Sequence, residues 1–324
     1  MRLASPIDLA GAAVAVAVLA VLPVLFPSSY VVGVLTVCLC YGIWAASWDF
    51  MSGLTGRENF GHSLFIGAGA YTAGFLNTEF GVNAWWSLLA APAAAVLFAL
   101  AVGFPTLRLR GPYFALAMLS ATTAMLYLTI IYSPYTGGQD GLNGLYPIID
   151  SPLHYYWMVL GFLVLTGAIL KLLAKAPFGT LLRAIRGDEA ACQASGINVT
   201  FYKIVALVIS AGFAGLGGAL YAHYQLQVGP DLFTVTLTIN IIIICYVGGI
   251  GSIYGAVGAA VLLNILTESL RGLSEYRLWV YTLVLMLILF FLPGGFVAPL
   301  WRRLRARLAP ARTRASAVDE KAPA

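Results

Sequence analysis

Long apolar segments separated by short polar ones make up most of the chain. Many of these segments approach the roughly 20 residues that a helix needs to cross the hydrocarbon core of a bilayer. They lack the strict alternation of an outer-membrane β-barrel, so strands are excluded. The pattern predicts an all-α, polytopic transmembrane helical bundle of about ten spans, some of them short or broken.

The predicted spans share an apolar run bounded by polar, glycine or proline residues. They are Ala10–Phe26, Tyr30–Trp48, a short Ser63–Leu76, Ala84–Phe104, Tyr113–Ile131, Tyr155–Leu173, Ile204–Leu226, a short Leu237–Val247, Ile253–Leu270 and Leu278–Leu292. The first is read as a retained span, because bulky residues stand where a signal-peptide cleavage site needs small ones.

Composition supports a membrane protein and argues against an enzyme. Hydrophobic residues make up 60% and charged residues 10% of the 324 positions, with a mean hydropathy of +0.89, whereas soluble domains are about 25% charged. The three histidines, His62, His154 and His223, are scattered, and the four cysteines show no metal-ligand spacing. No metal site or catalytic residue is predicted, and no phosphate-binding Gly-x-x-x-x-Gly-Lys-Ser/Thr motif is present.

Positive charges indicate the orientation of the bundle. Lysine and arginine collect in three groups: Arg108 and Arg110; Lys171, Lys175, Arg183, Arg186 and Lys203; and Arg302, Arg303, Arg305 and Arg307. Alternating spans place all three groups on one side, which the positive-inside rule makes the cytoplasm. We therefore expect a multi-pass protein of the cell (inner) membrane with both termini cytoplasmic. Residues 1–301 form the membrane domain, and residues 302–324 a disordered cytoplasmic tail near anionic lipid.

A polar island at residues 177–198 interrupts the apolar pattern, within a predicted cytoplasmic loop at 174–203. Asp188 is suited to cap the start of a short helix and Glu189 to its positive first turn. Gly196 is suited to the left-handed position that ends it. The pattern predicts a short amphipathic helix parallel to the membrane. Because this helix lies outside the bilayer, we expect Glu189→Lys to cost little folding energy.

Glycine and polar residues also break the apolar pattern at 55–71 and 248–255. The two segments resemble a parallel internal repeat, and broken helices are where transporters build their pathway. The predicted path residues are Asn59, Gly61, Ser63, Gly67, Gly69, Asn240, Gly249 and Gly251. Close helix packing by glycine, or helix-to-helix hydrogen bonds from the polar residues, explains each of them equally well.

Several motifs together resemble the permease subunits of branched-chain amino acid ABC importers, and specifically the second of the paired permeases. The motifs are Asn59-Phe60-Gly61-His62-Ser63-Leu64-Phe65-Ile66-Gly67-Ala68-Gly69-Ala70-Tyr71-Thr72, Leu109-Arg110-Gly111-Pro112-Tyr113-Phe114-Ala115, Thr136-Gly137-Gly138-Gln139-Asp140-Gly141-Leu142, the loop at 177–198 and Val247-Gly248-Gly249-Ile250-Gly251-Ser252. The resemblance covers roughly residues 30 to 295.

The resemblance implies partners. They are a homologous second permease, two ATPase subunits that hold ATP and Mg²⁺, and an extracytoplasmic solute-binding protein, with no cofactor in this chain and no nucleic acid. The residues that it implies for coupling to the ATPase are Arg183, Arg186, Asp188, Glu189, Ala190, Ala191 and Gly196. Glu189-Ala190-Ala191 resembles the start of the general importer motif, although the glycine follows by seven positions instead of six. A solvated loop held near lipid is the alternative. Gln139 and Asp140, in a loop without lysine or arginine, are expected to contact the binding protein.

The implied function is inward transport of leucine, isoleucine and valine or a related small solute, driven by separate ATPases. Permeases for urea and short amides are similar, so the cargo stays open. A channel or secondary transporter that works without an ATPase is a further alternative, although intramembrane carboxylates are few: Asp49 and Glu268 lie near span ends.

Overall fold

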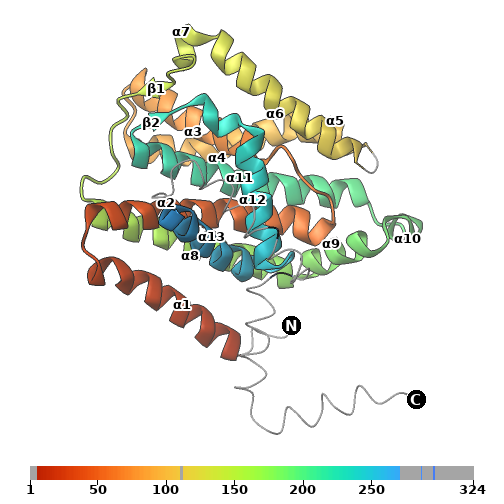
Figure 1. Ribbon diagram of the computed structural model, residues 1–324. Coiled ribbons are helices and arrows are strands. Elements are labelled where there is room, and N and C mark those ends of the chain that lie inside the picture. The colour runs from red at the N-terminus through yellow and green to blue at the C-terminus, as the bar shows by residue number, and fades with distance from the viewer. Residues whose placement is uncertain (1–5, 110–111, 271–285, 287–294, 296–324) are drawn as a thin grey trace.

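A computed structural model describes residues 6–109, 112–270, 286 and 295, most of which lie in helices (Figure 1). The predicted all-α class is confirmed. The long helices are α1 (Pro6–Leu25), α2 (Ser29–Trp48), α3 (His62–Thr78), α4 (Ala84–Phe98), α6 (Tyr113–Ile131), α8 (Pro152–Lys175), α9 (Pro177–Gly187), α11 (Val199–Gln225), α12 (Val235–Gly248) and α13 (Ile253–Ser269). Shorter elements are η1 (Asp49–Gly53), η2 (Ala99–Gly103), α5 (Phe104–Thr106), α7 (Ser133–Thr136), β1 (Leu142–Asn143), α10 (Glu189–Ala194), β2 (Gln227–Val228) and η3 (Pro230–Phe233).

Five of the described helical segments are long and apolar enough to cross a membrane: Ser29–Gly53, Ala84–Thr106, Tyr113–Ile131, Pro152–Lys175 and Val199–Gln225. The pair α12 and α13 adds a sixth if it is counted as one span, although the two helices meet at a bend of 115°. The count of about ten spans stays a prediction, and the predicted span Leu278–Leu292 falls largely outside the described residues.

The centre of the bundle depends on close approach between α3 and α11. A Cβ atom added to Gly69 would come within 2.3 Å of the Gly215 carbonyl oxygen, and one on Gly218 within 2.2 Å of the Ile66 carbonyl oxygen. Small residues thus let the two backbones touch, which is how helices pack in lipid without a hydrophobic drive between them. On the other side of the bundle, α2 packs against α8, α11 and α13.

The bundle has two distinct ends. At one, β1 pairs antiparallel with β2, with Leu142 opposite Val228; we call this the β1–β2 end. At the other, the loop between η1 and α3 meets α9 and α10 (Figure 1); we call this the α10 end. Helix α11 runs from just after α10 to just before β2, and its 27 residues make it roughly 40 Å long.

The loop expected at 174–203 is mostly helical, because α9 fills its first half and α11 begins at Val199 instead of Ile204. The side chain of Asn198 accepts a hydrogen bond from the Phe201 backbone N–H at 3.1 Å and so caps α11 early. This cap brings the polar first turn, with Lys203, into the helix. The apolar pattern therefore predicts a start at Ile204, later than the observed start at Val199.

Candidate functional site: the α10 end

The chain turns sharply from α8 into α9 at the α10 end. Pro177 occupies the first turn of α9, where its missing N–H is not needed. The Arg183 guanidinium donates a hydrogen bond of 2.9 Å to the carbonyl oxygen of Ala174, near the end of α8. A Cβ atom on Gly179 would lie 2.2 Å from that same oxygen, so glycine permits the turn. Arg183 thus stabilises the corner within the chain.

Helix α10 is capped at both ends. The Asp188 carboxylate accepts a hydrogen bond from the Ala191 backbone N–H at 3.0 Å. At the other end Gly196 has a φ of 80°, and the N–H groups of Gly196 and Ile197 bond to the carbonyls of Gln193 and Cys192. This pair of bonds is a Schellman motif. The predicted helix with Asp188 before it and Gly196 after it is confirmed, while its role in coupling stays a prediction.

A small apolar cluster holds α9, α10 and the start of α11 together. Ile185, Cys192 and Val199 are buried against one another, with Ile197 and Tyr202 packed on them. The opposite face of α10 is exposed and consists mainly of small side chains: Ala190, Ala191, Gln193 and Ala194. The turn from α9 into α11 therefore presents the exposed face of a capped helix outward.

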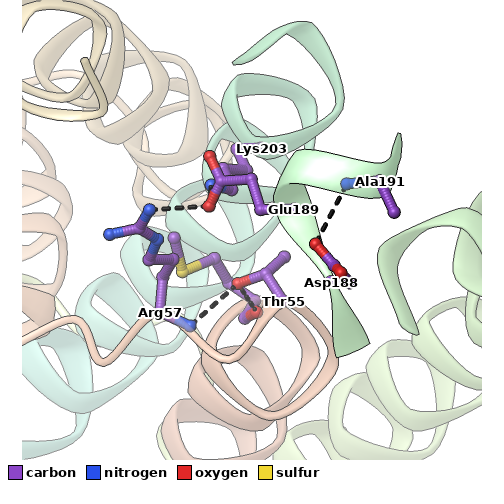
Figure 2. A network of polar contacts seen from close by, with 7 residues as sticks. Thr55, Arg57, Asp188, Glu189, Ala191 and Lys203 are labelled. Atoms are coloured by element: carbon purple, nitrogen blue, oxygen red, sulfur yellow. Dashed lines mark hydrogen bonds and ion pairs between the residues drawn. The ribbon is translucent and has the colours of Figure 1, made fainter. Parts of the chain in front are cut away.

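Glu189 points into the chain from α10 (Figure 2). Its Oε2 atom lies 2.7 Å from the Arg57 Nη2 and 2.6 Å from the Lys203 Nζ, and the Lys203 side chain is only 2% exposed. Arg57 is held in place because its backbone N–H donates to the Thr55 hydroxyl, which in turn donates to the Met51 carbonyl. One carboxylate therefore joins α10 to the loop before α3 and to α11.

This geometry corrects one expectation. Reversing the charge of Glu189 should lower the stability of the fold. A lysine there would face Arg57 and Lys203 and would leave the buried ammonium group of Lys203 without its counter-charge. The helix lies outside the apolar spans as expected, but the carboxylate, on a side chain that is 35% exposed, pairs with Arg57 and Lys203 of this chain.

The electrostatics of Glu189 agree with the contacts. Partial burial alone would raise the pKa of its carboxyl, but the hydrogen bonds from Lys203 and Arg57, with their positive charges, outweigh burial and lower the pKa below its ordinary value. The carboxylate is therefore ionised at neutral pH, and both ion pairs are present.

Arg186 connects α9 to the end of η1 and lies close to the bend between α12 and α13. Its guanidinium Nη1 donates to the Gly53 carbonyl oxygen at 2.5 Å, at the end of η1. One turn earlier, the Asp49 Oδ1 accepts a hydrogen bond of 2.6 Å from the backbone N–H of Gly251, in the bend between α12 and α13. Gly249 and Gly251 have φ values of 94° and 80°, which only glycine adopts readily. The two glycine-rich breaks thus meet beside Arg186.

The predicted path residues do not share one environment. Asn59 is buried, its Oδ1 accepts from the Gly61 N–H at 2.9 Å, and its Nδ2 has no partner among the described residues. Ser63 is buried and accepts a 2.8 Å hydrogen bond from Thr238 of α12. Asn240, on α12, is partly exposed.

Three of the glycines among these residues, Gly61, Gly67 and Gly69, are packing positions. A Cβ atom on Gly67 would meet the Phe233 ring at 2.4 Å, on Gly69 the Gly215 backbone, and on Gly61 the Met118 carbonyl at 2.7 Å. These contacts are those that close helix packing requires. A role in the path stays a prediction for all eight residues.

Gln139 and Asp140 lie at the β1–β2 end and are both exposed. The Asp140 carbonyl accepts hydrogen bonds from the side chains of Asn143 and Gln227, which ties this loop to β1 and β2. Their side chains are accessible to a partner, and a role in binding one stays a prediction.

The pairing of Glu189 with Arg57 and Lys203 was not predicted from the sequence. A usable signal is Lys203 itself, since an ammonium group four residues into a long apolar helix needs a carboxylate, and Asp188 and Glu189 are the nearest acids along the chain. The described residues hold no group of three or more histidine, cysteine or acidic side chains that could bind a metal ion.

The apolar helices, the bend of 115° and the capped helix at one end together define a multi-pass membrane protein of the transporter class. Comparison with known proteins identifies the family. The model of the family described as branched-chain amino acid transport system / permease component matches residues 30–293, and the chain belongs to this family.

Curated relatives agree with this assignment. The chain is 29% identical over 295 residues to the high-affinity branched-chain amino acid transport system permease protein LivM of Salmonella typhimurium, covering 82% of this chain and 69% of the relative. It is 29% identical over 313 residues to the protein of the same name from Escherichia coli, covering 88% and 74%. It is 22% identical over 311 residues to a probable branched-chain amino acid transport permease, LivM, of Methanocaldococcus jannaschii, covering 79% and 90%. No solved structure matches the chain.

Proposed function

We propose that this chain is the membrane subunit of an ABC importer that carries branched-chain amino acids into the cytoplasm, driven by ATP hydrolysis in separate subunits. The observation that carries the proposal is the family match over residues 30–293, joined to a capped helix whose exposed face is available to a partner. Two relatives named for high-affinity transport of these amino acids support the cargo.

The α10 end faces the cytoplasm in this proposal. Lys171, Lys175, Arg183 and Arg186 gather toward that end, whereas the segments 136–150 and 228–233 at the β1–β2 end carry Asp140, Asp150 and Asp231 without lysine or arginine. The positive-inside rule therefore favours a cytoplasmic α10 end. The protein would lie in the cell (inner) membrane with both termini in the cytoplasm.

Helix α10 would dock in a cleft of the ATPase through Ala190, Ala191 and Ala194. Movement of the ATPase would displace α10 as a rigid unit, because both ends of the helix are capped and Cys192 anchors it to α9 and α11. Glu189 would pass this displacement to Arg57 and the loop before α3. Arg186 would pass it to Gly53 and, through the Asp49–Gly251 contact, to the bend between α12 and α13.

The importer would contain a homologous second permease, two ATPase subunits holding ATP and Mg²⁺, and an extracytoplasmic binding protein that contacts Gln139 and Asp140. This chain itself would bind no cofactor. The absence of a P-loop motif from the whole sequence supports hydrolysis in the partner chains.

The test is uptake of labelled L-leucine by proteoliposomes that contain this chain with its partner chains and binding protein. We expect uptake that needs internal ATP and stops when the P-loop lysine of the ATPase is replaced. The rigorously purified single chain should hydrolyse no ATP. Uptake by this chain without any ATPase would replace the proposal with a channel or secondary transporter, and uptake of urea but not leucine would correct the cargo.

A further inference from the structure

One face of α3 is covered by the segment that follows β2. Ser63, Gly67 and Tyr71 stand four residues apart, so they lie on the same face of the helix. The Thr238 hydroxyl of α12 donates to the Ser63 hydroxyl oxygen at 2.8 Å and accepts from the Ser63 backbone N–H at 3.0 Å. Phe233 of η3 covers Gly67 and Tyr71. Two of the predicted path residues, Ser63 and Gly67, therefore lie under one continuous segment.

Phe233 fills the space beside Gly67. Its side chain is fully buried, and its ring stacks on that of Tyr71 with the ring centroids 5.4 Å apart. A Cβ atom on Gly67 would lie 2.4 Å from the Phe233 ring, so the helix and the ring are in direct contact. Helix α3 starts next to the α10 end and runs toward β1. Phe233 therefore lies between Ser63 and the β1–β2 end along this face.

The Tyr71 hydroxyl favours a second arrangement of this face. Tyr71 is 9% exposed, and its hydroxyl is buried without a hydrogen-bond partner among the described residues. A buried hydroxyl without a partner costs free energy, which a hydrogen bond to water or to a passing solute would recover. Separation of Phe233 from α3 would supply that partner.

We propose that η3 and α12 form a gate over this face of α3, and that Phe233 closes the gate toward the β1–β2 end. The proposal rests on the function proposed above and names the element that moves during import. When η3 and α12 separate from α3, the face with Ser63, Gly67 and Tyr71 opens to solute from the binding protein.

The gate moves as one unit because Thr234 joins η3 to α12. The Thr234 hydroxyl donates to the Asp231 carbonyl oxygen of η3 at 2.7 Å and accepts from the Leu237 backbone N–H at 3.4 Å. This second bond caps the start of α12. A displacement of α12 therefore carries Phe233 with it.

The far end of α12 is connected to α10. The Tyr246 hydroxyl donates to the Glu58 Oε1 atom at 2.5 Å. Glu58 follows Arg57, which pairs with Glu189 of α10, so neighbouring residues of one loop hold α10 and α12. The 14 residues of α12 span roughly 20 Å. A movement of α10 can therefore reach Phe233 through this loop and α12.

The first experiment locks the gate with a disulfide. Ser63→Cys and Thr238→Cys are combined, because their side-chain oxygens lie 2.8 Å apart and a disulfide can replace that contact. The complete importer in proteoliposomes is oxidised with copper phenanthroline, and leucine uptake is measured before oxidation, after it and after reduction. The native cysteines Cys38, Cys40 and Cys245 of the spans are buried, and each single variant is the control for unintended pairs.

Oxidation of the double variant should lower uptake at least tenfold, and reduction should restore it. Oxidation should not change uptake by either single variant. Full uptake by the cross-linked importer would overturn the proposal, because α12 then need not leave α3. Failure of the two cysteines to cross-link would overturn it as well, because the contact between α3 and α12 would be absent.

The second experiment tests Phe233 by the accessibility of Ser63→Cys to a hydrophilic methanethiosulfonate in nanodiscs. Without ATP we expect slow labelling, and at least tenfold faster labelling when Phe233→Ala is added. ATP with leucine-loaded binding protein should also accelerate labelling in the chain that keeps Phe233. Ser210→Cys is the matched control, since Ser210 is equally buried but lies on α11, where its hydroxyl donates to the Ser47 carbonyl. Equal labelling of Ser63→Cys in all conditions would reject Phe233 as the closing residue.

A size exchange separates the gate contact from ordinary helix packing. Gly67→Ala should lower uptake, and Phe233→Ala in the same chain should recover part of it by removing the ring that the new methyl group meets. Gly69→Ala meets the Gly215 backbone instead, so Phe233→Ala should not rescue it. Rescue of neither variant, or of both, would contradict the specific contact between Gly67 and Phe233.

The results for the gate and for the importer are distinguishable. ATP-dependent uptake that persists in the cross-linked state rejects the gate and leaves the proposed function standing. If the reduced importer takes up no leucine, the proposed function is rejected, and labelling of Ser63→Cys with and without Phe233→Ala still decides whether Phe233 closes this face. The disulfide lock keeps Phe233 in place, so it tests the gate even if Phe233→Ala does not fold.

Discussion

The two ends of the bundle are held together by different forces. At the α10 end, charged groups pair across segments far apart in the chain: Glu189 with Arg57 and Lys203, and Arg186 with the Gly53 carbonyl. At the β1–β2 end, neutral groups hold the loops, because the Asn77 amide bonds to the Val82 carbonyl and the Tyr146 N–H, and His223 bonds to the Tyr146 carbonyl.

This difference between ion pairs and neutral hydrogen bonds agrees with the role that we propose for each end. Removing one partner of an ion pair with a buried lysine leaves an uncompensated charge, so Glu189 holds α10 firmly to Arg57 and Lys203. Neutral hydrogen bonds hold a loop in shape while leaving Gln139 and Asp140 exposed for a transient partner. We propose that the α10 end transmits displacement and that the β1–β2 end contacts the binding protein.

The same charge reversal at each end gives the largest predicted contrast. Glu189→Lys places three cations together and should destabilise the chain by roughly 2–3 kcal/mol, less than a fully buried pair because the Glu189 side chain is 35% exposed and partly screened. Asp140→Lys, at an exposed position, should change stability by at most about 0.5 kcal/mol. Thermal unfolding of the purified protein measures both.

A charge swap is the control for this prediction. Glu189→Lys combined with Lys203→Glu restores opposite charges at the same positions and should recover much of the lost stability. If Glu189→Lys unfolds at the wild-type temperature, the ion pairs do not hold the α10 end.

Removing a neutral hydrogen-bonding side chain at the β1–β2 end should lower the free energy of unfolding by less. Asn77 is buried, and Asn77→Leu leaves the Tyr146 N–H and the Val82 carbonyl without their partners, at about 1–2 kcal/mol. Hydrogen exchange should rise around Val82 and Tyr146 and stay unchanged in α9 and α10. Faster exchange in α10 would mean that the two ends are not separate units.

Acid should weaken the ion pairs of Glu189 and leave the hydrogen bonds of Asn77 unchanged. The folded pKa of Glu189 lies below its ordinary value, so the unfolded chain binds more protons between the two values. The stabilisation that is present at neutral pH is therefore lost as the pH falls below about 4.3 toward the folded pKa. The amide of Asn77 does not titrate.

Hydrogen exchange at pH 6 and pH 3, corrected for intrinsic rates, measures this difference. Protection in α9 and α10 should fall, while protection around Val82, which Asn77 holds, should persist. An equal loss at both ends would remove Glu189 as the cause.

The smallest effect is expected at the loop tip. Gln139→Cys should leave stability unchanged, because the side chain is exposed. An impermeant maleimide should label it in intact cells. Labelling only after permeabilisation would reverse the proposed orientation.

The sequence predicted the features that depend on local chemistry. Long apolar runs predicted the helices, and Asp188 and Gly196 predicted α10, because caps act within a few residues. It did not predict the partners of Glu189, since Arg57 lies 132 positions away and tertiary folding alone brings the two together. Nor did it separate packing glycines from path glycines. The clash of a Cβ on Gly69 with Gly215 depends on how closely α3 approaches α11, which local pattern does not encode.

The central claim is that α10 is fastened inward through Glu189 and couples to an ATPase through its outer face. Ala191→Arg tests it, because Ala191 is exposed and its backbone N–H stays capped by Asp188. Ala191→Ser, which keeps the side chain small, is the matched control.

The measurement is leucine uptake together with stimulated ATP hydrolysis in proteoliposomes of the complete importer, with thermal unfolding of each variant. For Ala191→Arg we expect at least a tenfold loss of uptake and of stimulated hydrolysis at an unchanged unfolding temperature, and for Ala191→Ser wild-type values. Wild-type uptake by Ala191→Arg would contradict the account.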